Sequence, residues 1–167
     1  MKRSHDYVYV PFCMLSQGIR ATSIVRVYPA VVNPVIELLM QKDINIIQMP
    51  CPELIFDGFH RKPCGKPQYD NPENRKVCKE VSQGIVDQMK FFKKYECNLR
   101  LVLGIDFSPS CAVSVLSGRY KHQRKTGKGI FIEELQNIMR VEGIEIPFVG
   151  TRIYEIEETI KSIKAYI

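Results

Sequence analysis

Short runs of β-branched and aromatic residues alternate along the chain with longer segments in which apolar residues recur every three or four positions. The short runs predict strands over residues 7–12, 44–49, 99–105 and 144–149. The longer segments predict helices over residues 34–42, 72–95, 131–141 and 154–165. Strands that alternate with helices favour a parallel sheet with helices on both faces. We therefore predict a single α/β domain over residues 1–167, with an open, mostly parallel, Rossmann-like sheet.

The composition is that of a globular chain and not of a disordered or disulfide-dense one. Of the 167 residues, 45% are apolar and 25% are charged, which is enough for one buried core. No apolar run reaches the ~18 residues of a membrane span, and the N-terminal run has no small-residue cleavage site. These features predict a cytoplasmic protein without a membrane partner. In that reducing compartment, the six cysteines are expected to serve ligation or catalysis and not disulfide bonding.

Three of the cysteines follow three of the predicted strands. Cys13 and Cys51 come directly after the first and second strands, and Cys111 lies a few residues after the third. The carboxyl ends of parallel strands meet at one edge of a sheet, where ligands bind in α/β folds. We therefore expect the three thiols to converge on one pocket. Prolines beside them, Pro52 and Pro109 among these, stiffen two of the three loops.

Three thiolates without an evident fourth ligand are typical of two kinds of metal site. One is an iron–sulfur cluster with one exchangeable iron, and the other is a zinc ion with an exchangeable position. Spacing alone does not separate them, because the chain has no C-x-x-C pair. A cysteine is also often a small buried apolar residue. That interpretation is kept for Cys64, Cys78 and Cys97, of which Cys64 is the first candidate for a spare ligand.

The residues around the three cysteines resemble a known family. The segments Phe12-Cys13-Met14-Leu15, Cys51-Pro52-Glu53 and Ser108-Pro109-Ser110-Cys111 are similar, in this order, to the three cysteine motifs of the thiouracil desulfurase family. The resemblance implies an α/β domain in which Cys13, Cys51 and Cys111 bind a 4Fe–4S cluster. It also implies non-redox, hydrolytic removal of sulfur from a small thiolated substrate whose sulfur binds the open iron.

Such a desulfuration needs groups that move protons, and two carboxylates are the first candidates. Glu53 lies two residues after Cys51 and is expected to act as general acid or base. Asp106 ends the third predicted strand and is the second catalytic candidate. Each has a structural alternative, because Glu53 also suits the first turn of a helix and Asp106 also suits a turn.

Four further polar residues are candidates for the substrate site. Ser108 is expected to take part in catalysis and Ser110 to bind substrate, unless the two serines cap a helix that begins near Cys111. Arg20 is expected to clamp an anionic group of the substrate, with an exposed structural arginine as the alternative. Gln48 is a weaker candidate for a substrate contact, and its alternative is an ordinary strand residue.

The segment 118–130 is basic throughout. It contains Arg119, Lys121, Arg124, Lys125 and Lys128 without an acidic residue, in a chain of net charge +6. We expect a mobile loop over this segment. Its residues 119–128 could contact the phosphates of a thiolated tRNA or nucleotide, and the alternative is a solvated loop.

The sequence therefore predicts an enzyme, an iron–sulfur-dependent hydrolase or lyase that removes sulfur from a thiolated nucleobase, nucleoside or related compound. Two alternatives stay open. One is a non-enzymatic iron–sulfur protein that carries sulfide on the same cluster. The other is a basic binding domain whose cysteines are structural or bind zinc.

Overall fold

A four-stranded parallel sheet forms the centre of the computed structural model, which describes residues 3–118 and 123–167. The strands are β1 (Asp6–Pro11), β2 (Asn45–Met49), β3 (Asn98–Ile105) and β6 (Phe148–Thr151). They lie in the order β2-β1-β3-β6, and each neighbouring pair runs parallel. This arrangement confirms the predicted fold class, an open parallel α/β sheet.

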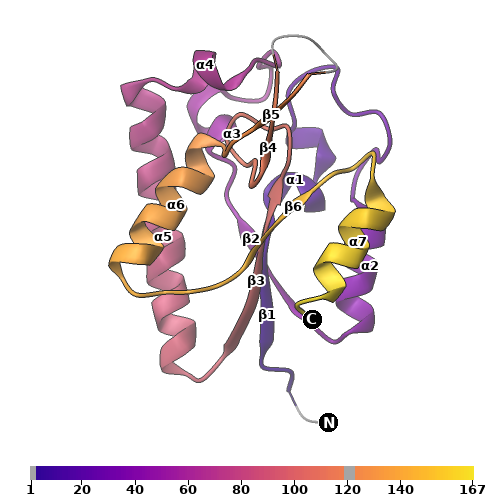
Figure 1. Cartoon of the computed structure of the whole chain (residues 1–167), viewed down its shortest axis with the longest axis vertical. Coiled ribbons are helices and arrows are strands. Elements are labelled where there is room, and N and C mark those ends of the chain that lie inside the picture. Colours follow the sequence, from indigo (N-terminus) through magenta and orange to yellow (C-terminus); the bar gives the residue numbers. More distant parts are fainter. Residues whose placement is uncertain (1–2, 119–122) are drawn as a thin grey trace.

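Helices cover both faces of the sheet. The pair on one face is α2 (Asn33–Gln41) and α7 (Ile156–Lys164), and the pair on the other is α5 (Pro72–Lys94) and α6 (Ile130–Val141), as Figure 1 shows. The chain moves from β1 to β2 in one direction and from β2 past β1 to β3 in the other. Because such crossovers are right-handed, this reversal puts α2 and α5 on opposite faces. Within the described residues, no helix combines the length and apolarity needed to cross a bilayer.

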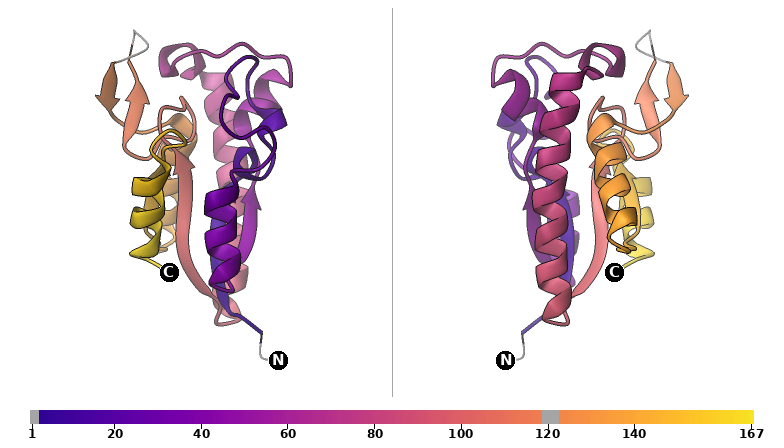
Figure 2. Two further views of the ribbon diagram at one scale, coloured as in Figure 1. Left: turned by 90° about the vertical axis from the view of Figure 1, so that its right-hand side faces the viewer. Right: turned by 90° about the vertical axis from the view of Figure 1, so that its left-hand side faces the viewer.

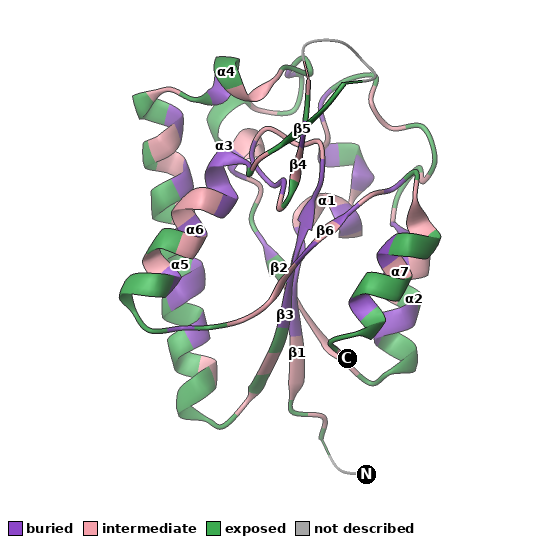
Figure 3. Ribbon diagram, in the orientation of Figure 1, coloured by how far each residue is buried: buried purple, intermediate pink, exposed green. Residues whose placement is uncertain are grey.

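The core is densest around the two central strands. Residues 8–10 of β1 and 101–103 of β3 have no exposed surface, and Figure 3 shows the burial concentrated in this region. On α5, the buried apolar residues recur at helical spacing and pack into the core; they are Cys78, Ile85, Val86 and Met89. The central strands are continuous apolar runs because helices cover them on both sides.

Short elements gather at the carboxyl ends of the strands. They are α1 (Phe12–Leu15), the 3₁₀ helix η1 (Gln17–Ile19), α3 (Pro52–Asp57), α4 (Lys66–Tyr69) and a hairpin of β4 (Val115–Ser117) and β5 (Arg124–Thr126). Figures 1 and 2 show α3, α4 and the hairpin at the top of the molecule, beyond the strand ends. The predicted site therefore lies where the chain is built from loops and short helices.

Three predicted segments differ from the structure. The strand predicted over 144–149 begins only at Phe148; Ile144 and Ile146 alternate toward the core within the connection from α6, and Pro147 has no N–H for a strand ladder. The stretch 59–71, for which the sequence analysis predicted neither helix nor strand, contains α4. The basic loop expected over 118–130 contains β5, while its residues 119–122 lie outside the described residues. The mobility of that segment stays a prediction.

Candidate active site

Cys13, Cys51 and Cys111 line one cavity of about 260 Å³ at the carboxyl edge of the sheet. Cys13 lies in α1 after β1, Cys51 lies between β2 and α3, and Cys111 lies in the turn that follows β3. Because β1 pairs with both β2 and β3, the ends of these three strands are neighbours. The order of the strands along the chain reverses at β1, and this is the position at which open α/β sheets bind ligands.

All six cysteines are free thiols, and four of them line this cavity. Cys111 is buried, and Cys13 and Cys51 are half-buried. The fourth is Cys64, which is exposed in the segment between α3 and α4. The remaining two, Cys78 and Cys97, lie outside the cavity lining, and Cys78 packs in the core. The three thiols of the predicted ligand set thus share the cavity with Cys64, the candidate spare ligand, and are separated by position from Cys78 and Cys97.

Three thiols that line one cavity are chemically suited to bind a metal group as thiolates. Both an iron–sulfur cluster and a zinc ion are bound by cysteine thiolates, so the donor set is compatible with either kind of site. In the part of the chain that the structure describes, no group of three or more His, Cys, Asp or Glu side chains is gathered closely enough for one metal ion. The assignment of Cys13, Cys51 and Cys111 as cluster ligands stays a prediction from the motif resemblance.

Glu53 lies in the same cavity, in the first turn of α3. One carboxylate oxygen accepts a hydrogen bond from the Ser108 hydroxyl at 3.2 Å, and the other faces the Arg61 guanidinium at 3.4 Å. Its structural alternative, a first-turn helix acid, is therefore also met. Glu53 reaches from the Cys51 loop to the Cys111 loop, which fixes the carboxylate beside the thiols.

Arg61 is a residue of the site that the sequence analysis did not single out. Its side chain is only 3% exposed, and its guanidinium faces Glu53, the Gly58 carbonyl oxygen at 2.9 Å and the Cys51 sulfur at 3.9 Å. A buried cation needs anionic partners. Glu53 supplies one negative charge, and a Cys51 thiolate would supply a second. The only sequence signal was its place in a basic triplet, His60-Arg61-Lys62, which is more typical of an exposed loop.

The Ser108 hydroxyl makes three hydrogen bonds to other groups of the protein. The hydroxyl donates to Glu53, and its oxygen accepts the backbone N–H groups of Ser110 at 3.2 Å and Cys111 at 3.0 Å. The predicted helix cap is wrong in detail, because residues 109–111 form a turn and no helix begins at Cys111. Ser108 therefore holds both the carboxylate and the Cys111 loop in place.

Asp106 lines the cavity, but its carboxylate is engaged in the fold. One oxygen accepts the backbone N–H groups of residues 113, 114 and 115, and the other accepts from the Ser114 hydroxyl and the Arg152 guanidinium. The residue is 3% exposed. This geometry matches the turn-forming alternative and leaves Asp106 no free oxygen for proton transfer.

Arg20 also lines the cavity, and a second buried polar residue orients it. The Gln17 side chain, which is 1% exposed, accepts from Arg20 at 3.3 Å and donates to the Cys13 carbonyl oxygen. Arg20 is half-buried and its charge lowers the pKa of Cys13, against the larger effect of burial. Arg20 is therefore not an exposed arginine, while its contact with Gln17 fits a structural role and its contact with substrate stays a prediction.

Two residues predicted to bind substrate lie outside the cavity lining. Gln48 is exposed on the edge strand β2, so it matches its alternative as a strand residue. Ser110 is completely buried, and its hydroxyl has no hydrogen-bond partner in the described residues. Its backbone faces the start of α6, where a Cβ on Gly129 would lie 2.2 Å from the Ser110 carbonyl carbon. Ser110 thus packs against the start of α6 and does not line the cavity, and its contact with substrate stays a prediction.

The described basic residues of 118–130 are partly engaged with the protein. Arg124 on β5 pairs with Glu155 and lies over the Phe107 ring, 5.4 Å from its centroid. Lys128 donates to Gln136 at 2.6 Å. Lys125 is exposed, and Arg119, Tyr120, Lys121 and His122 lie outside the described residues. A nucleic-acid role for this segment stays a prediction.

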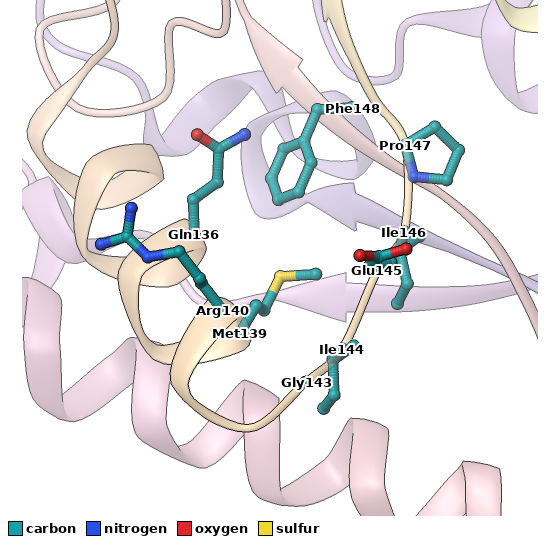
Figure 4. Close-up of a pocket in the computed structure, with 9 residues that line it drawn as sticks. All are labelled: Gln136, Met139, Arg140, Gly143, Ile144, Glu145, Ile146, Pro147 and Phe148. Atoms are coloured by element: carbon teal, nitrogen blue, oxygen red, sulfur yellow. The ribbon is translucent and has the colours of Figure 1, made fainter.

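A second hollow, of about 480 Å³, lies at the opposite end of the sheet (Figure 4). It separates the carboxyl-terminal part of α6 from the connection into β6, and its walls include Met139, Arg140, Glu145 and Phe148. Figure 4 shows one carboxylate, one guanidinium and no thiol among its side chains. This hollow therefore lacks the thiols that the predicted chemistry needs.

The buried thiols are expected to react slowly near neutral pH. Burial raises the pKa of Cys13 to about 12, so the reactive thiolate is scarce until the pH rises. At pH 8 we expect iodoacetamide to alkylate Cys13 in the folded, metal-free protein roughly thirty times more slowly than free cysteine. The rate should rise about tenfold per pH unit between pH 8 and 11. Peptide mass mapping measures the alkylation rate of Cys13. Equal rates in folded and urea-unfolded protein would contradict the conclusion that burial raises the pKa of this thiol.

About half of the chain is similar in sequence to a curated protein. No protein-family model matches the chain. Over 81 residues it is 36% identical to the uncharacterized protein MJ0003 of Methanocaldococcus jannaschii, a match that covers 48% of this chain and 51% of that relative. The chain thus spans about half the length of the curated relative it matches.

A solved structure is similar over nearly the whole chain. It is that of the 4Fe–4S-dependent thiouracil desulfidase TudS, and the similarity covers 96% of this chain and 99% of that one, at 16% identity and a TM-score of 0.49.

Proposed function

We propose that the chain is an enzyme that hydrolyses the carbon–sulfur bond of a small thiolated compound. The observation that carries the proposal is the joint placement of three thiols and an anchored carboxylate in one cavity. Cys13, Cys51 and Cys111 would hold a 4Fe–4S cluster, as the motif resemblance implies. When bound by three thiolates, such a cluster supplies one iron with an exchangeable position and hence Lewis acidity toward sulfur.

The reaction balances without an electron donor or acceptor. A thiocarbonyl and one water give a carbonyl and hydrogen sulfide: the carbon–sulfur bond breaks, a carbon–oxygen bond forms, and both water protons leave with sulfur. Among the cavity residues, Glu53 is the group that accepts a proton from water and returns it to the departing sulfur. Ser108 and Arg61 hold the two carboxylate oxygens and so fix the direction from which Glu53 acts.

The positive charges around the cavity support an anionic occupant. Arg61 approaches Cys51, and the charge of Arg20 lowers the pKa of Cys13. Three thiolates and a carboxylate together would be costly to bury without such compensation. We place Arg20 at the substrate, where its guanidinium would bind an oxygen or anionic group of the thiolated compound.

Anaerobic reconstitution followed by incubation with 2-thiouracil tests the proposal. Many equivalents of uracil and sulfide per protein are expected, with none from metal-free protein. At most one equivalent of sulfide, retained on the protein, would favour the sulfide-carrying alternative. Failure to form any cluster would leave a binding domain with structural cysteines.

A further inference from the structure

The cavity has an apolar and aromatic side that the proposed chemistry does not use. Ile24, Pro63, Ile153, Tyr154 and Phe107 line it together with the thiols. Tyr154 is 68% exposed and Phe107 is half-buried, so both rings lie between solvent and the interior. An apolar wall opposite a few polar groups is the usual composition of a small-molecule site.

Phe107 has an unusual backbone conformation for a residue with a large side chain. Its φ is +73°, in the left-handed region that residues with bulky side chains rarely adopt. The residue lies between Asp106 and Ser108, directly beside the residue that orients Glu53. Such outliers persist only where the surrounding structure holds them, and they concentrate at functional sites.

The protein holds Phe107 from several directions. Its N–H donates to the Val115 carbonyl oxygen at 2.7 Å, and its carbonyl oxygen accepts from the Ser117 hydroxyl at 3.1 Å. The Arg124 guanidinium lies over its ring. Arg124 in turn pairs with Glu155, which pairs with Arg152, which pairs with Asp106. Three charged side chains thus link the ring of Phe107 to the carboxylate of its neighbour Asp106.

We infer that Phe107 is a specificity-determining residue that presents its ring to a planar ring of the substrate. The fold fixes this side chain at the cavity wall, so that a flat heterocycle stacks against it while its thiocarbonyl points toward the thiols and Glu53. Contacts between aromatic faces and bases tolerate differences in the base, because each base has a π-face. The inference rests on the proposed function for the reacting group, while the ring contact itself needs no metal.

Phe107→Leu removes the ring while keeping a bulky apolar side chain, branched at Cγ, on the same strained backbone. Uracil, the sulfur-free ring, is titrated into metal-free protein by ligand-observed NMR. We expect Phe107→Leu to weaken its binding about tenfold and Phe107→Tyr to keep it within about twofold. Phe91→Leu, an exposed phenylalanine on α5 outside the cavity, is the matched control and should change nothing.

Kinetics on reconstituted protein add a second readout. For 2-thiouracil, Phe107→Leu should raise KM about tenfold at similar kcat, while kcat/KM for thiourea, an acyclic thione, stays within about twofold. Equal losses on both compounds, or unchanged uracil binding, would overturn the inference. If wild-type protein desulfurates neither compound but binds uracil through Phe107, the proposed function fails and the ring contact stands. An absence of uracil binding to wild type overturns the ring contact alone.

Discussion

Cys51→Ser is expected to abolish the iron–sulfur centre. The hydroxyl is a much weaker ligand for iron than a thiolate, and Cys51 belongs to a set of only three cavity thiols with strand-end positions. We expect at least about a hundredfold loss of iron affinity and no visible cluster absorption after anaerobic reconstitution. Cys13→Ser and Cys111→Ser should behave alike. Iron and sulfide content with visible spectra gives the measurement.

Cys97→Ser is the matched control for these substitutions. Cys97 lies between α5 and β3, outside the cavity lining, so its variant should load iron as the wild type does. Circular dichroism of each metal-free variant checks that the fold is kept. Equal iron loss in Cys51→Ser and Cys97→Ser would contradict the ligand assignment.

Glu53→Gln should lower kcat by about 10²–10⁴ while leaving the iron content unchanged. The amide has nearly the shape of the carboxylate, so the Ser108 contact can persist while the proton-accepting oxygen is lost. The kcat of the variant is compared with that of the wild type by measuring uracil formed from 2-thiouracil in quenched samples, normalised to bound iron.

The control for this change is Glu73→Gln. Glu73 is also a first-turn helix acid, on α5, and it does not line the cavity. Its variant should keep full activity. Wild-type kcat in Glu53→Gln would remove Glu53 from the proton-transfer role, and a parallel loss of iron would show that the residue acts on the cluster site instead.

The position of the site could be predicted from the sequence because the end of each strand is marked by residues that are close together in the chain. β-branched runs marked β1, β2 and β3, and parallel pairing then required the residues after them to share one edge. Glu53 could be placed for the same reason, since it is two residues from Cys51. The connection before β6 was misread because Ile144 and Ile146 alternate as they would in a strand.

The partners within the site could not be read from the sequence. Arg61 lies in a polar loop, and only the tertiary fold shows that it is buried against Glu53 and Cys51. Gln17 likewise looks like an ordinary polar residue until its buried contact with Arg20 is seen. The burial of Ser110 was equally hidden in the sequence, because its place in the motif suggested a substrate contact and only the fold shows it packed against the start of α6.

The pairing of β1 with both β2 and β3 also sets the order of events during synthesis. Parallel neighbours need long crossovers, so their contacts span many residues and form late in folding. Cys13 and Cys51 can meet once β2 has emerged from the ribosome, but Cys111 joins them only after α5 and β3 have been made and docked. Under the proposed function, a metal group held by all three thiols would therefore enter only after β1, β2 and β3 have paired.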